Sequence, residues 1–407
     1  MLVALIAAFA GCSSHLHERV DSPALCLGSV PEGYAFPQPL DGRARPLSRD
    51  TFFARLARFR AILIGERHDR LDHHFNQLEV LCELHARGVS LAVGFEAFHQ
   101  PFQPDLDAYV AGEIDLAQLL ERTEYYTRWR FDHRLYTPLF RFARANRLPM
   151  VALNVPREVT RRLGDAGFGA VGKADSAFFP HGLREPPDTY RERNRTIFSQ
   201  HRTSGGATEP AAFDRFVRVQ WMWDEAMAQR SATFLHTHPS RTLVVIAGSG
   251  HIAYADAIPE RMAAAWSSLG HRPLGVARVL QGARRHDGHG GIVATHNAAV
   301  PVAHDIWLTG PAMALPPMGR LGVFLDSGGT DVSVSSLAAE SSAGDAGIKP
   351  GDRLVSIAGT GVKSFTEVKL VLAKYRPGDT VSIDVIRPAG GHGPAPRTPL
   401  TFDVRLH

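Results

Sequence analysis

Two Gly-x-x-His tetrapeptides carry the residue types in this chain that are best suited to chemistry. They occupy residues 65–68 and 248–251, and each follows an apolar, β-branched run that predicts a buried strand. Each is followed by a segment that favours a helix. The two histidines should therefore lie at the carboxyl ends of strands, which is the edge of an open α/β sheet where ligands bind. Imidazoles at such an edge, with carboxylates nearby, predict a metal, iron or acid/base site.

Two carboxylates accompany these histidines. Glu66 shares the first turn with His68, and Glu96 ends the next predicted strand. If that strand is the neighbour of the first, Glu96 lies close to both. Carboxylates and imidazoles together suit a divalent ion such as Mn, Fe or Zn, or general acid–base chemistry without a metal. The candidate metal ligands, and the candidate catalytic residues if the protein is a hydrolase, are Glu66, His68, Glu96 and His251.

Further histidines follow the first motif on a predicted helix, 70–87. One face of this helix is apolar and carries Leu71, Phe75, Leu78 and Cys82. His74 flanks that face and is a candidate for a buried, oriented role, or for a core-edge histidine bonded to a carbonyl. His73 points away from it and should be solvated. His286 and His289 lie in a glycine-rich loop and should also be solvated.

The elements that position these residues alternate between strand and helix, which predicts a mostly parallel sheet flanked by helices. The expected strands are 61–65, 89–95, 149–154, 242–247 and 273–280, with 305–309 as a candidate last strand. The expected helices are 70–87, 104–122, 134–146, one from Pro156, and 210–236. A hydrophobic fraction of 44% is enough for a large core. The net charge is only +4 and no Lys/Arg run stands out, so the sequence shows no nucleic-acid footprint.

The N-terminus resembles a bacterial lipoprotein signal. A short apolar stretch leads to Cys12, which would become the lipidated first residue and anchor the protein to a membrane of the cell envelope, facing the periplasm or the exterior. We expect residues 1–12 to be this signal and 13–50 to be a tether or irregular lead-in. An exported compartment permits a disulfide between Cys26 and Cys82, but a buried free thiol is the commoner state for a helical cysteine such as Cys82.

The C-terminal part resembles a PDZ domain of the bacterial type. We expect a linker over 311–319 and the PDZ domain, a small β-sandwich or barrel, over 320–405. The segments that carry the likeness are Arg320-Leu-Gly-Val323, Ala346-Gly-Ile-Lys-Pro-Gly-Asp-Arg-Leu354 and Pro377-Gly-Asp-Thr-Val381. PDZ domains bind an extended peptide C-terminus as an added strand. By this resemblance the backbone amides of Leu321, Gly322 and Val323 receive the terminal carboxylate.

The first domain, expected over 51–310, resembles the ChaN family of haem-binding uptake lipoproteins, within the wider erythromycin-esterase and Tiki group. The residues that carry this likeness occur in order along the domain: Gly65-Glu-Arg-His-Asp69, His73-His74, Gln77, Phe95-Glu96, Trp129, Asp132, Tyr136, Ala152-Leu-Asn-Val-Pro-Arg157, Gln220-Trp-Met-Trp-Asp-Glu225, Met227-Ala228 and Gly248-Ser-Gly-His-Ile252.

The resemblance implies haem or iron held between two subunits, with a tyrosine reaching the iron and a histidine near the propionates. The corresponding cofactor-binding candidates here are His68, His74, Tyr136 and His251. Tyr136 has an alternative role as a hydroxyl bonded at a helix edge. Trp129, Trp221 and Trp223 are expected in the core.

Three functional hypotheses follow. The favoured one is an envelope lipoprotein that binds haem or iron for uptake and uses its PDZ module to bind a peptide or partner. By the resemblance we expect it to form a homodimer. The second is a hydrolase, a peptidase or esterase with or without a metal, that uses the paired Gly-x-x-His motifs. The third is an adaptor in which the PDZ domain supplies the main function. No Gly-x-Ser-x-Gly elbow lies near the site, which argues against a serine hydrolase.

Overall fold

The computed structural model describes most of the chain. The described residues are 34–201, 210–282, 285–286, 292–293, 305–326, 331–388 and 399–407. The predicted signal at 1–12, the lipidation of Cys12 and the predictions for Cys26 and His289 lie outside these residues. The side chain of His286 is also outside the description.

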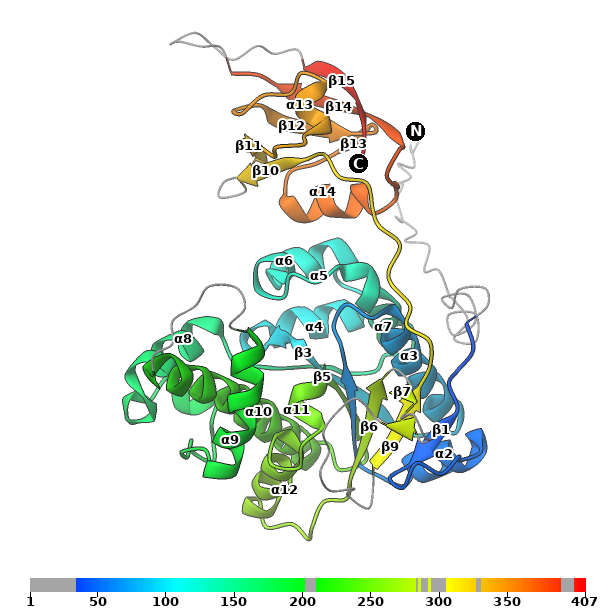
Figure 1. The fold of residues 1–407 in the computed structure, drawn as a ribbon, viewed down its shortest axis with the longest axis vertical. Coiled ribbons are helices and arrows are strands. Elements are labelled where there is room, and N and C mark those ends of the chain that lie inside the picture. Colours follow the sequence, from blue (N-terminus) through cyan, green and yellow to red (C-terminus); the bar gives the residue numbers. More distant parts are fainter. Residues whose placement is uncertain are drawn as a thin grey trace, which may run out of the picture.

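A seven-stranded sheet forms the centre of the first domain, in the order β1-β9-β6-β2-β5-β3-β4 (Figure 1). The strands are β1 (Pro39–Asp41), β2 (Ala61–Glu66), β3 (Leu91–His99), β4 (Met150–Asn154), β5 (Thr242–Gly248), β6 (Val276–Gly282) and β9 (Asp305–Thr309). Neighbouring strands are parallel, except that β1 runs antiparallel to β9. The mostly parallel sheet predicted from the sequence is confirmed.

Helices cover both faces of this sheet. They are α2 (Arg49–Leu56), α3 (Leu71–Ala86), α4 (Gln103–Ala111), α5 (Leu116–Arg122), α6 (Tyr125–Arg128), α7 (His133–Ala145), α8 (Arg157–Ala166), α9 (Asp188–His201), α10 (Pro210–Thr237), α11 (Ser249–Ile252) and α12 (Ile258–Ser268). Alternate strand residues enter opposite cores, because successive side chains of a strand point to opposite faces. Ile62 and Ile64 pack with α2, α3 and α7, whereas Ala61 and Leu63 pack with α10 and α12.

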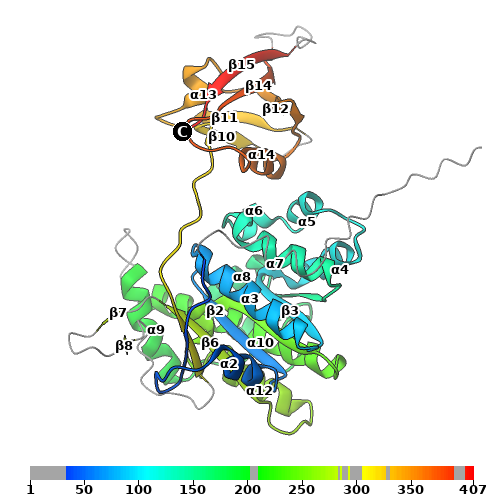
Figure 2. The same ribbon diagram turned by 90° about the vertical axis from the view of Figure 1, so that its right-hand side faces the viewer.

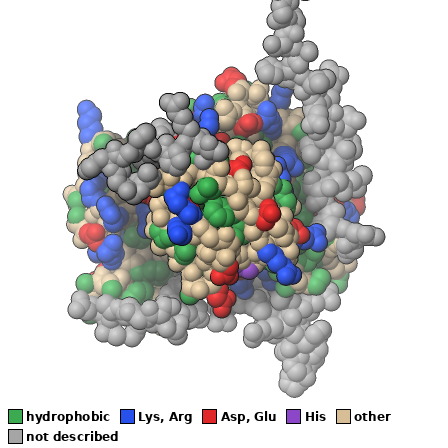
Figure 3. Space-filling model, turned by 90° about the horizontal axis from the view of Figure 1, so that it is seen from above, with side chains coloured by type: hydrophobic (Ala, Val, Ile, Leu, Met, Phe, Trp, Pro, Cys, Tyr) green, Lys and Arg blue, Asp and Glu red, His purple; other side chains and the backbone are tan. Residues whose placement is uncertain are grey.

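The second domain is a small antiparallel sheet with one longer helix. Its elements are β10 (Val323–Asp326), β11 (Ser333–Leu337), α13 (Ser342–Asp345), β12 (Arg353–Ile357), β13 (Thr360–Gly361), α14 (Phe365–Leu372), β14 (Thr380–Ile386) and β15 (Leu400–Arg405). The strand order is β10-β11-β12-β14-β15, with β13 paired to β12. β10 is therefore an edge strand. Seen from above, this end of the molecule carries charged side chains of both signs, scattered among uncharged ones (Figure 3).

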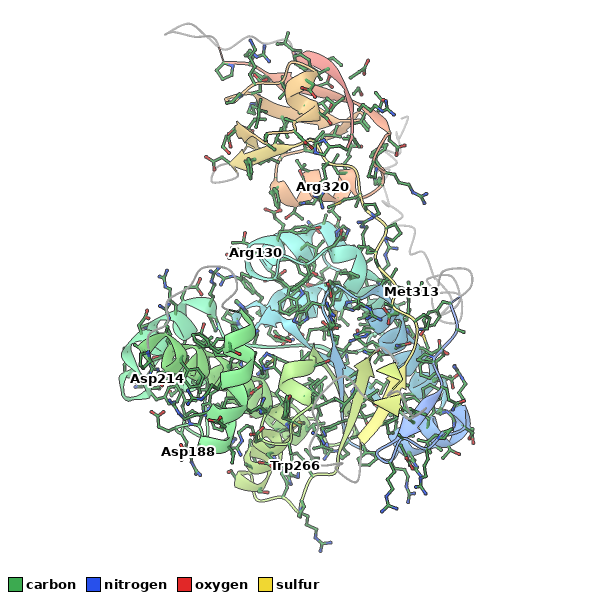
Figure 4. All side chains as sticks on the ribbon, viewed as in Figure 1. Arg130, Asp188, Asp214, Trp266, Met313 and Arg320 are labelled. Atoms are coloured by element: carbon green, nitrogen blue, oxygen red, sulfur yellow. The ribbon has the colours of Figure 1, made fainter. Side chains whose placement is uncertain are left out.

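The two domains touch through α14, which lies next to α5 and α6 in both ribbon views (Figures 1 and 2). The ring of Phe365 packs edge-on against Tyr126, with 5.8 Å between the ring centroids. Leu370 contacts the core of the first domain. Arg130, which follows α6, is at the end of the first domain nearest to the PDZ-like domain, whereas Trp266 is at the opposite end (Figure 4).

Two segments expected to be connectors belong to the first domain. Within the lead-in, Pro39–Asp41 pairs with β9, so the domain begins before Thr51 and the tether prediction is wrong for these residues. Within the linker, the backbone amide of Met313 donates to Asp72 Oδ1 (2.9 Å), and the Met313 carbonyl accepts from the Leu71 amide (3.0 Å). The linker thus covers the first turn of α3.

Cys82 is disulfide-bonded, so the expectation of a free thiol is wrong. Its partner lies outside the described residues. Helical periodicity identifies the face on which Cys82 lies, but it carries no signal for the approach of a second cysteine from a distant segment. In the part of the chain that the structure describes, every helix is too short or too polar to cross a membrane.

Candidate functional site

The two Gly-x-x-His turns lie side by side at the carboxyl edge of the sheet. β2 and β5 are adjacent parallel strands, and Glu66 is level with Gly248. Each motif begins with a glycine that faces the other motif. A Cβ at Gly248 would lie 3.1 Å from Cε1 of His68, and one at Gly65 would lie 3.1 Å from Oγ of Ser249. The two histidines, almost two hundred residues apart in sequence, therefore meet at one site.

The first histidine is held by a carboxylate from its own turn. Nδ1 of His68 donates to Glu66 Oε1 (2.8 Å), which leaves Nε2 directed toward Gly248. Glu66 is buried at the end of β2 and also accepts hydrogen bonds from the Tyr136 hydroxyl and from Gln77 Nε2 (2.7 Å). Because three donors hold Glu66, its position and the ring orientation of His68 are fixed.

Burial and hydrogen bonding act in opposite directions on this pair. Burial raises the pKa of Glu66, but the nearby His74 and the hydrogen bond from His68 outweigh it and lower this pKa to about 2. For His68, burial lowers the pKa, while the hydrogen bond to Glu66 and the charge of Glu96 outweigh it and raise this pKa above its ordinary value. Glu66 is therefore a carboxylate at neutral pH.

The second histidine is held by a carboxylate from a distant helix. Nδ1 of His251 donates to Asp224 Oδ1 (2.7 Å), and Asp224 Oδ2 accepts from the Tyr190 hydroxyl (2.6 Å). Asp224 is buried in the middle of α10. Burial alone would lower the pKa of His251, but Asp224 and then Glu96 raise it to about 9. His251 is therefore an imidazolium at neutral pH.

Glu96 lies between the two histidines. Its Oε2 accepts from the Gly248 amide (2.7 Å), and its Oε1 lies 3.6 Å from Nε2 of His251. The condition that β3 neighbours β2 is not met, because β5 lies between them. Glu96 still reaches the site, since it directly follows the last residue of β3 that pairs with β5 and its side chain needs to cross only that one strand.

A cavity of about 450 Å³ opens beside these groups. Its wall includes Glu66, His68, His251 and Phe131, together with residues of α9. The His68 ring is flanked by Trp129 and Phe131, at centroid distances of 4.6 and 4.8 Å. The site therefore combines aromatic rings beside His68, an oriented imidazole whose Nε2 bonds none of the described residues, and buried carboxylates that are already paired.

Two other predicted ligands are buried behind the cavity. Nδ1 of His74 lies 3.1 Å from Gln77 Oε1, and its Nε2 donates to the His68 carbonyl (3.2 Å), which is the carbonyl-bonded alternative. The Tyr136 hydroxyl donates to Glu66, so its role is to hold that carboxylate. His73 is only 2% exposed, and the prediction that it is solvated is wrong. Its Nδ1 accepts from the Arg67 amide (2.9 Å) because burial, which lowers its pKa to about 4, keeps the ring neutral.

The predicted divalent-metal set is not assembled. Among the described residues there is no group of three or more His, Cys, Asp or Glu side chains placed to hold a metal ion. Glu66 and Glu96 bind protein donors instead, and His251 faces Glu96 as a cation. The aromatic expectations hold in part: Trp221 is fully buried, whereas Trp129 and Trp223 are partly buried and lie against His68 and His251.

Sequence reasoning missed three residues of this site: Asp224, Tyr190 and Arg193. Asp224 shares a helix with the fully buried Trp221 and Met222, and a carboxylate among such apolar residues needs a buried partner. That was a usable signal. Tyr190 and Arg193 lie on α9, a mostly polar helix with no apolar stripe to indicate which face is covered.

Comparison with known proteins agrees with this architecture. A family model described as haem-binding uptake, Tiki superfamily, ChaN matches residues 52–262, just over half of the 407-residue chain. The chain belongs to this family. A solved structure described as cofacial haem binding to ChaN of Campylobacter jejuni has a TM-score of 0.51 and 15% identity, and covers 68% of this chain and 98% of that chain. At this identity the likeness shows the ChaN fold. No curated protein matches the chain.

The second domain is a PDZ domain, because a PDZ family model matches residues 319–403. Solved structures matched over 22% of this chain include a serine endoprotease from Yersinia pestis (20% identity, TM-score 0.18, 28% of that chain). Another is the HtrA-type protease AlgW with a decapeptide (24% identity, TM-score 0.19, 22% of this chain, 30% of that chain).

The predicted carboxylate loop of the PDZ domain leads into its edge strand. Carbonyls of Leu321 and Gly322 accept from the amides of Ala343 (3.0 Å) and Ala338 (2.9 Å). The amides of Leu321 and Gly322 donate to no other described residue. Gly322 has φ +69°, a conformation that favours glycine. Val323 is the first residue of β10, whose outer edge is unpaired among the described strands.

Proposed function

We propose that the ChaN-family domain binds haem in the cavity beside the two Gly-x-x-His turns, with Nε2 of His68 as the group that faces the iron. The observation that carries this is the state of His68: its Nδ1 is anchored to Glu66, its Nε2 is uncommitted, and two aromatic rings flank it. Ligating histidines commonly donate their other ring nitrogen to a carboxylate in this way.

The residues around this cavity fit haem. A porphyrin needs apolar contact, which Phe131 and Ile197 of the cavity wall offer, and a donor for the iron. The cavity volume of about 450 Å³ is in the range of small-molecule sites. Tyr136 is a poor donor here because its hydroxyl is already bonded to Glu66 inside the protein. When bound, haem supplies the iron and its spectrum, while Glu66 orients His68 and the ring wall excludes water.

The test is a haemin titration of the purified chain, followed by the Soret band. We expect a stoichiometric shift in the wild type and a weaker, spectrally different complex in His68→Ala. His236→Ala is the matched control, because His236 lies in the last turn of α10 by the opposite edge of the sheet. No Soret shift in the wild type, or an identical spectrum in His68→Ala, would contradict the proposal.

The wider role we propose is that of a haem- or iron-uptake lipoprotein of the bacterial envelope. The disulfide at Cys82 supports an oxidising compartment, and the residues around Cys12 support a lipid anchor facing the periplasm or exterior. A membrane-fraction comparison of wild type with Cys12→Ser tests the anchor. The cofacial haem described for the Campylobacter jejuni protein supports a homodimer, which light scattering with and without haemin tests.

For the PDZ domain we propose capture of a peptide C-terminus at residues 321–323, with the peptide added to the edge of β10. The unbonded amides of Leu321 and Gly322 support this. Peptides with a free and an amidated C-terminus distinguish carboxylate capture from other binding. Equal affinity for the two peptide forms would contradict it.

A second candidate is an acid–base hydrolase of peptides or esters. It is favoured by the position of Glu96, a carboxylate beside two carboxylate-anchored imidazoles, which a haem carrier does not obviously need. General acid–base work by such groups contributes about 10²- to 10⁴-fold to a rate. Ester and peptide panels test it, with and without added Mn²⁺ or Zn²⁺. Undiminished activity in His68→Ala would eliminate it.

A further inference from the structure

One face of α9 forms a wall of the cavity in which we propose that haem binds. Tyr190, Arg193, Asn194 and Ile197 all line it, at the i, i+3, i+4, i+7 spacing that places residues on one side of a helix. The start of α9, at Asp188, is marked in Figure 4. This wall was not foreseen from the sequence, and it brings one arginine to the same cavity as His68 and His251.

Arg193 is held rigidly. Its guanidinium carbon lies over the ring of Tyr190 at 4.6 Å and over the ring of Tyr254 at 4.2 Å. Its Nη2 donates to Asp256 Oδ1 (2.7 Å), and the side chain is only 13% exposed. An arginine fixed between two rings has little conformational entropy left to lose when it binds a ligand.

Arg193 also has unused donors. Its buried Nε has no hydrogen-bond partner among the described residues, and none of those residues bonds Nη1. The carboxylates of the site are occupied elsewhere: Glu66 by Tyr136, His68 and Gln77, and Glu96 by the Gly248 amide. Nη1 is thus the donor left for an acceptor that a ligand brings, whereas Nε is enclosed by protein atoms.

We propose that Arg193 binds a carboxylate group of the ligand and so selects anionic ligands at this cavity. The inference rests on the proposed haem function, in which that carboxylate is a porphyrin propionate. Guanidinium and carboxylate match in charge and planar geometry, which makes the contact both strong and directional. Gln220 lines the same cavity from α10.

The experiment compares haemin with its dimethyl ester, which keeps the iron and ring but lacks the carboxylates. Wild type, Arg193→Gln, Arg193→Lys and Arg195→Gln are titrated with both. Arg195 is the matched control, because it lies on α9 with a side chain 63% exposed. We expect the wild type to prefer haemin over the ester by about 10- to 100-fold, the range for a charge-assisted hydrogen bond.

In Arg193→Gln this preference should fall to near unity while the Soret maximum stays that of the wild type, because the iron donor is unchanged. Arg193→Lys should keep part of the preference for haemin over the ester, and Arg195→Gln should keep all of it. A retained preference in Arg193→Gln would overturn the inference and leave haem binding intact. A wild type without any Soret response would overturn both.

Discussion

The histidine of each Gly-x-x-His turn is bonded to a carboxylate, but the two carboxylates come from different parts of the chain. Glu66 and His68 are two residues apart, so one turn supplies both partners. His251 instead bonds to Asp224, which is 27 residues away on α10. The first pair is therefore set by local geometry, whereas the second exists only after α10 has docked on the sheet.

The surroundings of the two histidines differ as well. The His68 side chain is 24% exposed and faces aromatic rings and the cavity, whereas that of His251 is 11% exposed and faces two carboxylates. His251 is thus a structural cation that holds Glu96 and α10 in place. His68 keeps a ring nitrogen for a ligand. Sequence repetition of a motif therefore does not imply repetition of its role.

Asp224→Asn tests the second pair, Asp224 and His251, and should cause the largest loss of stability. The substitution keeps an acceptor for Tyr190 but removes the charge beside a buried imidazolium, and breaking a buried pair costs about 3–5 kcal/mol in the free energy of unfolding. The pKa of His251 should fall from its raised value of about 9. Denaturant unfolding and NMR titration of the ring measure both.

The control is Asp69→Asn, because Asp69 lines the same cavity but its side chain is 62% exposed. It should change the free energy of unfolding by less than about 0.5 kcal/mol. If the two variants lost equal stability, the structural role of the second pair would be refuted.

The pH dependence of stability gives the next largest effect. The pKa of His251 is about 9 in the folded protein against 6.5 ordinarily, so its stabilisation is complete below about pH 6.5 and is lost as pH rises through 9. Glu66 acts oppositely: its pKa is lowered from 4.5 to about 2, so its stabilisation holds above pH 4.5 and is lost as pH falls through 2.

The measurement is the difference in unfolding free energy between wild type and His251→Gln at about pH 6 and about pH 10. We expect this difference to shrink by up to about 3 kcal/mol at the higher pH, from a shift of this size. A difference that stays constant across this range would show that His251 is not a cation in the folded protein.

Much of the first domain follows from the sequence, because each buried strand is a continuous apolar run and each helix has a distinct face. The strand ends also predict which polar residues reach the ligand-binding edge. The order of the strands does not follow, since an apolar run such as Leu243–Ala247 looks the same at any position in a sheet. That is why β5 was not placed between β2 and β3.

The side chains that were misjudged are polar residues covered by distant segments. His73 lies off the apolar face of α3, yet it is buried: its ring accepts from the Arg67 amide and its carbonyl accepts from Nε2 of Gln281 on the distant strand β6. Asp224 lies among apolar residues of α10, which indicates a buried partner, but only the fold shows that this partner is His251. Local pattern identifies faces, but only the folded chain determines which faces become covered.

Tyr136→Phe tests the first pair, Glu66 and His68. It removes one of the hydrogen bonds to Glu66, and a hydrogen bond to a charged group contributes about 1.5–3 kcal/mol. Because His68 and Gln77 still hold Glu66, we expect the lower end of that range, with a small shift in the His68 pKa. Tyr125→Phe is the control: the Tyr125 hydroxyl is buried without a partner among the described residues, so its loss should be neutral or stabilising. Equal losses in the two variants would contradict the assigned role of Tyr136.

The smallest effect should come from Gly248→Ala, which separates the two histidines directly. The added methyl would lie 3.1–3.2 Å from the His68 ring but meets no atom of His251 among its nearest neighbours. The ring can move by a few tenths of an ångström, so we expect a stability loss of about 1 kcal/mol, at the low end for added volume. Ring NMR signals of His68 should shift while those of His251 stay in place. Gly250→Ala, whose methyl would meet nothing within 4 Å, is the control. A shift confined to His251 would mean that the second turn, and not the first, faces the space beside Gly248.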